Sequence, residues 1–209
     1  MGPPILGVKL LTTFRQKEFE IIRNYLSPGE VAYLTNQLTN LDQSYFQHDL
    51  HVPNAFSIYN FMPFVEVLCN KLHIAANIIQ EPLLPGYAYA RKYQHGDDLY
   101  KHTDRESCEV ALSIHLYGDK DWPIFFEKTS GEVLELNLRP GDALLYEGHI
   151  NQHWREKYTG KEYGQFFLFY VKSRGKYATN YFDLEIQAMR AVSERQRNML
   201  LKQSLKYKK

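Results

Sequence analysis

The chain has 209 residues, 44% of them apolar and 23% charged, so it can bury a core and its composition excludes a disordered polypeptide. Its 25 Lys and Arg residues nearly balance 24 Asp and Glu residues, and a net charge of +1 argues against nucleic acid as a partner. No apolar run approaches the roughly 20 residues that span a bilayer, which argues against a membrane protein. Two cysteines are too few for a disulfide scaffold and, without a secretion-signal pattern, predict the reducing cytoplasm as the location.

Residues 1–83 are expected to form a mainly helical support region within a single domain that spans residues 1–209. Ser27 and Pro28 suit a helix N-cap and first turn, and the following GEVAYLTNQL has apolar residues three and four apart. The segment from Pro63 to Leu72, PFVEVLCNKL, has the same spacing. We expect both helices to pack against the rest of the domain.

Residues 84–172 change to strand patterns and are expected to form the core of the domain. Apolar residues alternate with others from Val110 to Tyr117, which places one apolar row on one face of a sheet. Alternation recurs from Leu134 to Arg139, a Pro-Gly-Asp turn leads into ALLY, and QFFLFYVK forms a last aromatic strand. Several short strands at this spacing favour a sandwich or barrel over a parallel α/β sheet.

Residues 173–209 are expected to form a helical extension rich in Arg, Lys, Gln and Met. An apolar stripe would pack along one side of this helix, and a basic face would be solvated, dock an acidic partner or form a dimer contact. The stripe is Leu184, Ala188, Ala191 and Val192, and the basic residues are Arg190, Arg195, Arg197, Lys202 and Lys206. The sequence leaves the oligomeric state open.

His102-Thr103-Asp104 is the motif in the strand region that carries chemistry. On an extended backbone, residues two apart point to the same side, so His102 and Asp104 can present a nitrogen and an oxygen to one metal ion. His153 follows the Pro-Gly-Asp turn and the ALLY strand and supplies a second imidazole. Two histidines and one carboxylate form the facial triad of non-haem Fe(II) oxygenases, which leaves coordination positions open, whereas a structural zinc site closes its shell.

Four motifs of this region, in their order along the sequence, resemble those of the Fe(II)- and 2-oxoglutarate-dependent dioxygenases, specifically the prolyl 4-hydroxylase-like branch. They are Tyr93-x-x-Gly96, His102-Thr103-Asp104, Pro140-Gly141-Asp142 and His153. The strings YAYARKY, HTDRESCE, WPIFFE and HWRE look like a compact bacterial and phage group of that branch. The resemblance implies a mainly β fold with flanking helices: a double-stranded β-helix, or cupin-like jelly roll, over residues 84–172.

The resemblance also implies the cofactor and the reaction. Fe(II) would be held by His102, Asp104 and His153, with 2-oxoglutarate and O2 as cosubstrates and ascorbate as a reductant. A substrate C–H bond would be hydroxylated, with succinate and CO2 as coproducts. His149 competes with His153 for the role of second histidine ligand, but its spacing from the Pro-Gly-Asp turn is too short for the resembled pattern, so we assign His153.

The resemblance places a tyrosine and a basic residue at the distal carboxylate of 2-oxoglutarate. Tyr93, on the strand that leads to the triad, has the position of the tyrosine. The sequence departs from the family pattern at the basic position, which follows the second histidine by nine or ten residues, because Glu162 and Tyr163 stand there. Substitutes that could bind this carboxylate are Arg155, Lys161, the uncharged Gln165, and Arg91.

Three functions remain open at the level of sequence. The first is hydroxylation of a peptidyl or protein side chain, such as proline. The second is hydroxylation of a free amino acid or another small metabolite, which a closed pocket with a substrate-facing charge would favour. The third, from a different class, is a jelly-roll metal-binding module without catalysis. Retention of all three ligands argues against this module, because three inward polar side chains are costly to bury without a metal.

Overall fold

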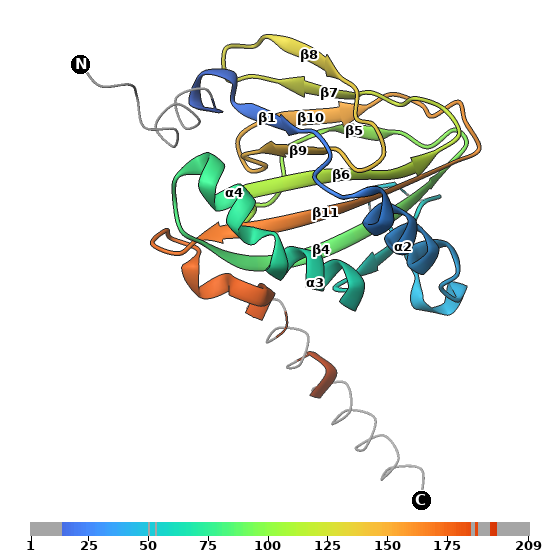
Figure 1. Cartoon of the computed structure of the whole chain (residues 1–209), viewed down its shortest axis with the longest axis horizontal. Coiled ribbons are helices and arrows are strands. Elements are labelled where there is room, and N and C mark those ends of the chain that lie inside the picture. Colours follow the sequence, from blue (N-terminus) through green and yellow to red (C-terminus); the bar gives the residue numbers. More distant parts are fainter. Residues whose placement is uncertain (1–13, 50, 53, 185–186, 188–192, 196–209) are drawn as a thin grey trace, which may run out of the picture.

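Two antiparallel β-sheets lie face to face in the computed structural model, which describes residues 14–49, 51–52, 54–184, 187 and 193–195 (Figure 1). The large sheet has the strand order β1-β9-β6-β11-β4-β3-β2 and the small sheet the order β5-β10-β7-β8. The strands are β1 (Phe19–Ile22), β2 (Gln47–His48), β3 (Phe56–Tyr59), β4 (Leu83–Gln94), β5 (Leu99–His102), β6 (Val110–Gly118), β7 (Ile124–Glu127), β8 (Val133–Leu136), β9 (Ala143–Tyr146), β10 (Gln152–Arg155) and β11 (Glu162–Lys172). The helices are α2 (Pro28–Thr39), α3 (Met62–Asn70) and α4 (Leu72–Ile79), with 3-10 turns η1 (Gln43–Tyr45) and η2 (Ala178–Asp183).

The path of the backbone from β4 to β11 is that of a jelly roll. β4, β6, β9 and β11 belong to the large sheet, and β5, β7, β8 and β10 to the small one, so the polypeptide crosses repeatedly between the two sheets. Phe126 of the small sheet packs with Phe167 and Phe169 of the large sheet in one buried cluster between them. The predicted double-stranded β-helix is therefore confirmed, and its interior is the space between the sheets.

Helices cover the outer face of the large sheet, as Figure 1 shows for α2, α3 and α4. Helix α2 begins with a capping box, in which the Ser27 side chain accepts from the Glu30 backbone and the Glu30 carboxylate accepts from the Ser27 backbone. Phe64 of α3 stacks on Phe166 of β11 with ring centroids 4.7 Å apart. The two helices expected from the sequence are present and pack as supports.

The amino-terminal region also contributes three strands that its sequence pattern did not reveal. β1 pairs with β9, β3 pairs with β4, and β2 pairs with β3, so these short segments widen the large sheet at both edges. A strand of four residues such as FEII has too little length to show a period of two. Its conformation is set by its partner strand, which lies far away in the sequence.

Strand β6 is buried on both faces, which explains its two kinds of side chain. Val110, Leu112, Ile114 and Leu116 pack beneath the helices, as the alternation predicted. The intervening Ser113 and His115 are also buried, because they face the interior between the two sheets. These inward polar residues belong to the site described below.

The carboxyl-terminal segment returns to the large sheet through η2, which packs against β4 and β11. Phe182 and Asp183 are two successive non-glycine residues with left-handed backbone, at φ of 48° and 55°. Of the predicted extension, Leu184 is exposed, whereas Ala188, Ala191, Val192 and four of the five basic residues lie outside the described residues. Within the described part of the protein, no helix combines the length and the apolar character needed to cross a bilayer.

Asp142 of the Pro-Gly-Asp turn ties the turn to the segment after β1. Its buried carboxylate accepts from Arg23 Nη1 at 2.5 Å and from the backbone N–H groups of Asn24 and Arg139 at 3.0 Å. Burial acts to raise the pKa of this carboxyl, but the three hydrogen bonds outweigh burial and hold its pKa below the ordinary value. Gly141, with φ of 89°, makes the turn possible without backbone strain.

Asp142→Asn should lower the free energy of unfolding by about 2 kcal/mol at pH 7, since charge-assisted hydrogen bonds are lost. Because the folded-state pKa is depressed, this stability is present above the unfolded-state pKa of about 4 and is lost as the pH falls through the lower folded value. Urea titrations at pH 7 and at about pH 2 should therefore show a difference between wild type and variant that shrinks in acid. Asp121→Asn, at an exposed position, is the control, and equal stabilities at pH 7 would refute the assignment.

Candidate metal centre

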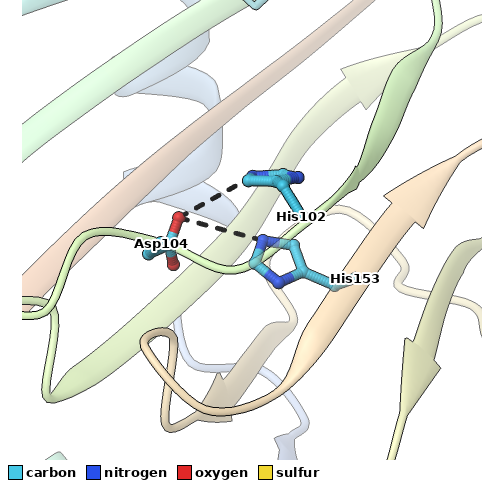
Figure 2. A group of neighbouring side chains, drawn as sticks. All are labelled: His102, Asp104 and His153. Carbon is cyan, nitrogen blue, oxygen red and sulfur yellow. Dashed lines mark ion pairs between the residues drawn. The ribbon is translucent and has the colours of Figure 1, made fainter.

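His102, Asp104 and His153 come together at one end of the small sheet (Figure 2). His102 is the last residue of β5, Asp104 follows two residues later, and His153 lies in β10, paired directly opposite His102. Asp104 Oδ1 is 3.8 Å from His102 Nε2 and 3.9 Å from His153 Nε2, and all three candidate ligand atoms lie within 4.8 Å of one another. The arrangement matches the spacing that one shared cation requires.

Backbone carbonyls orient both imidazoles. His102 Nδ1 lies 2.8 Å from the carbonyl of Tyr100, and His153 Nδ1 lies 3.1 Å from that of Asn151. A carbonyl can only accept, so Nδ1 carries the proton in each ring and Nε2 directs its lone pair toward Asp104. Orientation of this kind is typical of metal-binding histidines.

Burying the polar side chains of the triad costs free energy unless a cation is bound between them. Desolvation lowers the pKa of His153 to about 4, with further lowering by the positive charges of Arg155 and Arg91, and His153 is only 3% exposed. Burial also lowers the pKa of His102 and raises that of the Asp104 carboxyl. Asp104 Oδ2 is buried with no hydrogen-bond partner in the described residues. Two neutral imidazoles and an incompletely satisfied carboxylate fit a divalent cation with open coordination positions.

Gly148 makes room for the carboxylate. Its carbonyl accepts from the Asp104 backbone at 2.8 Å, so the two segments lie in contact. A Cβ at position 148 would overlap Asp104 Oδ2 and lie 3.1 Å from its Cγ. His149, the competing candidate ligand, instead places Nδ1 3.3 Å from the carbonyl of Cys108 and does not join the group.

The triad lines a cavity of about 530 Å³ that runs between the sheets. One wall is aromatic, with Tyr59, Tyr87 and Phe169 stacked in succession at centroid distances of 5.4 and 4.3 Å. Charged residues line the same cavity, and they form two pairs. The pairs are Arg91 with Asp49 and Arg105 with Asp183.

A row of polar residues crosses the inner face of the large sheet. Gln165 of β11 lies directly opposite His115 of β6 on one side and Arg91 of β4 on the other. Residues in such register share a face, so the three side chains are neighbours inside the jelly roll. Arg155 reaches this row from the small sheet, and its Nη2 donates to Gln165 Oε1 at 3.1 Å.

Arg155 is a buried cation without a carboxylate partner among the described residues. It is 2% exposed, donates to the carbonyl of Trp122, and lies over the rings of Trp122 and Tyr163 at 4.7 and 5.1 Å. Its Nε, like Nε2 of nearby His115, is buried with no hydrogen-bond partner in the described residues. A guanidinium in this state requires an anion for stability.

The other residues predicted to bind 2-oxoglutarate lie in different surroundings, two of them buried and one exposed. Tyr93 is fully buried, and its hydroxyl accepts from Arg91 Nη1 at 2.7 Å. Gln165 also donates to Ser113. Lys161 is exposed in the turn before β11 and is not part of the cavity wall, so the structure does not bring it to the triad.

Sequence reasoning missed the acidic partners of the cavity. Asp49 and Asp183 both line it, yet neither lies in a recognisable motif or near His102 in the sequence. Asp183 reaches the cavity because η2 folds back onto β4. The sequence did carry one usable signal, which is that Arg91 lies two residues before Tyr93 and on the same face of the strand.

No protein-family model and no curated protein matches the sequence. Solved structures do match, and they include 2-oxoglutarate- and iron-dependent enzymes. A prolyl-4-hydroxylase from Pseudomonas putida has a TM-score of 0.66 at 12% identity, over 81% of this chain and 100% of that one. HygX from Streptomyces hygroscopicus, with nickel, 2-oxoglutarate and hygromycin B bound, has a TM-score of 0.66 at 16% identity, over 79% of this chain and 87% of that one.

A third structure is the prolyl hydroxylase from Trichoplax adhaerens in complex with a peptide fragment of hypoxia inducible factor. It has a TM-score of 0.66 at 14% identity, over 81% of this chain and 90% of that one. These likenesses establish the fold: the protein folds as the 2-oxoglutarate- and Fe(II)-dependent oxygenases do, including prolyl hydroxylases, as the sequence motifs predicted.

Gly148→Ala should weaken the binding of a divalent cation at least tenfold, because the new methyl group displaces the Asp104 carboxylate. The measurement is an anaerobic titration with Fe(II) or Mn(II), together with a melting temperature to verify folding. Gly29→Ala is the matched control, since a Cβ there meets no atom within 4 Å. Unchanged metal affinity in a folded Gly148→Ala protein would contradict the role given to Asp104.

Proposed function

We propose that the protein is an Fe(II)- and 2-oxoglutarate-dependent oxygenase that hydroxylates an unactivated C–H bond. The observation that carries this proposal is the group of His102, Asp104 and His153 at a cavity of the jelly roll, with the guanidinium of Arg155, which has no carboxylate partner among the described residues, buried nearby. A metal with open positions and a separate anion site are what chelation of a 2-oxo acid requires. The likeness in fold to oxygenases supports the same assignment.

The three ligands would hold the iron through His102 Nε2, His153 Nε2 and an Asp104 oxygen. When bound, the iron and 2-oxoglutarate supply the activation of O2, with one oxygen atom entering the substrate and the other the succinate that forms with CO2. The protein orients its imidazoles by the carbonyls of Tyr100 and Asn151 and excludes water with buried aromatic side chains. Tyr146, whose hydroxyl lies 3.3 Å from His153 Nε2, is one of these.

Arg155 and Gln165 would bind the distal carboxylate of 2-oxoglutarate. The buried Nε–H of Arg155 has no acceptor within the described part of the protein, and Gln165 holds the guanidinium in place. Tyr93 would contribute its hydroxyl from β4. Arg91 is less suited to carry the charge alone, because Asp49 already neutralises it through a 2.6 Å contact. Arg155 thus replaces the basic residue that the family pattern places where Glu162 and Tyr163 stand.

The neighbours and the cavity support two candidate classes of substrate. A peptidyl side chain such as proline is the first candidate, since the similar structures include a prolyl hydroxylase with a bound peptide. A small molecule is the second, since another similar structure holds hygromycin B and since charged pairs line the cavity of this protein. We place the reaction in the reducing cytoplasm, which agrees with two free cysteines, and expect ascorbate to serve as reductant.

Succinate formation tests the proposal directly. Protein purified without oxygen and supplied with Fe(II), ascorbate, 2-oxoglutarate and air should form succinate. The His102→Ala and Asp104→Ala proteins should lose both the iron and this turnover, since two ligands hold the metal poorly. Full occupancy by zinc with no binding of 2-oxoglutarate would instead support a metal-binding module without catalysis.

Arg155→Gln should weaken 2-oxoglutarate binding at least tenfold while metal affinity stays unchanged, since a charge-assisted bond contributes about 1.5–3 kcal/mol. Calorimetric titration of the metal-free protein with Ni(II) measures the metal affinity, and titration of the Ni(II)-loaded protein with 2-oxoglutarate measures the second constant. Trp122, which lies 4.7 Å from the guanidinium, should report binding by fluorescence in a Trp154→Phe background. Arg139→Gln, on the surface, is the control, and an unaltered 2-oxoglutarate affinity in Arg155→Gln would refute this anchor.

A further inference from the structure

A second charged pair lies on the cavity wall, next to the triad in the sequence. Arg105 directly follows Asp104, and its Nη2 donates to Asp183 Oδ1 at 2.7 Å. The Tyr59 hydroxyl donates to the other oxygen of Asp183. Asp183 is 1% exposed, and all three residues line the cavity that holds the metal ligands. A buried acid and a partly exposed base therefore face the space where a substrate must lie.

The two charged pairs of the cavity differ in how completely they are satisfied. Asp49 accepts four hydrogen bonds: from Arg91 Nε, from the Tyr89 hydroxyl, and from the backbone of His51 and Val52. A carboxylate offers about four acceptor sites, so Asp49 is saturated.

Asp183 accepts from two donors in the described part of the protein, Arg105 and Tyr59. Arg105 carries five N–H donors, and the bond to Asp183 uses one of them. The Arg105–Asp183 pair thus keeps capacity for a ligand on both its acidic and its basic member.

Charge balance defines which ligand fits. A simple carboxylic acid would gain from Arg105 but meet the buried negative charge of Asp183, and a simple amine would meet the opposite conflict. A zwitterion presents a carboxylate to Arg105 and an ammonium group to Asp183, so each of the two charges gains a charge-assisted hydrogen bond and the net charge of the site stays constant. An internal peptide segment has neither of these two charges on its backbone.

The surroundings favour an amino acid with an apolar side chain. The guanidinium of Arg105 lies 4.3 Å from the ring centroid of Tyr87, which stacks between Tyr59 and Phe169. This aromatic wall offers an apolar surface beside the charged pair. The cavity of about 530 Å³ must also accommodate 2-oxoglutarate, and the space that remains suits a small molecule.

We infer that the substrate is a free α-amino acid, held by its carboxylate on Arg105 and its ammonium group on Asp183, with its apolar side group in the cavity that contains the triad. This inference rests on the proposed function and names its substrate class. The reaction is that of the proposed function, in which a C–H bond of the amino acid's side group becomes C–OH. Arg105 and Asp183 are then specificity-determining residues.

The test is a calorimetric titration of the full-length protein loaded with Ni(II) and 2-oxoglutarate. This complex can bind a substrate without converting it. Each of the twenty common L-amino acids is titrated, followed by the N-acetyl and the carboxamide forms of any that bind. We expect at least one amino acid with an apolar side chain to bind, and either blocking group to weaken it at least tenfold. This selectivity is a property of the wild-type protein and depends on no variant folding.

Variants then assign each contact. Arg105→Gln should abolish the discrimination between the free acid and its carboxamide, and Asp183→Asn the discrimination between the free amine and its N-acetyl form. Arg174→Gln, at an exposed position, should retain both. Binding of Ni(II) and 2-oxoglutarate should be unchanged in all three.

Two results would overturn the inference while the proposed function stands. One is that no free amino acid binds to protein that does bind Ni(II) and 2-oxoglutarate. The other is that doubly blocked amino acids or proline-containing peptides bind as tightly as the free form, which would assign a peptidyl substrate. Failure of the wild-type protein to bind 2-oxoglutarate at all would instead refute the proposed function itself.

Discussion

The antiparallel pairing of β5 with β10 is the constraint on which the site depends. It places His153 opposite His102, and Asp104 follows at the point where β5 ends. Neither strand exceeds four residues, so neither would hold this register alone. The register is maintained because β10 is also paired with β7, and because the small sheet packs through Phe126 onto the large sheet.

Burial of polar groups between the sheets then determines what each of them can do. Arg91 and Asp49 satisfy one another and are part of the wall. Arg155 lacks a carboxylate partner among the described residues, and Asp104 keeps an unpartnered oxygen there, so both favour an added ligand of opposite charge. A folded protein tolerates buried charges of this kind where the binding of a ligand compensates their cost.

Three kinds of recognition are therefore proposed for this region: a cation site of two imidazoles and a carboxylate on the cavity, an anion site at Arg155 near it, and the Arg105–Asp183 pair beside the aromatic wall of the cavity. Each uses charge next to buried groups, among them His153, Arg155 and Asp183, where electrostatic interactions are stronger than in water. Because the three groups differ in charge and position, a metal, a 2-oxo acid and a zwitterion would each bind to a different one of them.

The sequence by itself determined those features that depend on residues close together in the chain. Alternation from Val110 to Tyr117, the capping residues at Ser27 and the spacing of His102 and Asp104 predicted the strand, the helix and the ligand pair, because periodicity and capping act within a few residues. The family resemblance carried by the motifs predicted the jelly roll, and the spacing from the Pro-Gly-Asp turn favoured His153 over His149.

Only the tertiary structure decided the rest. Strand β1 owes its conformation to β9, Arg155 is identified by the lack of a carboxylate partner in the described residues, and Asp183 enters the cavity from a segment 78 residues beyond Arg105. These features depend on which side chains meet across the sheets and on which charges lose their water. Such contacts join residues far apart in the sequence, and no local pattern specifies them.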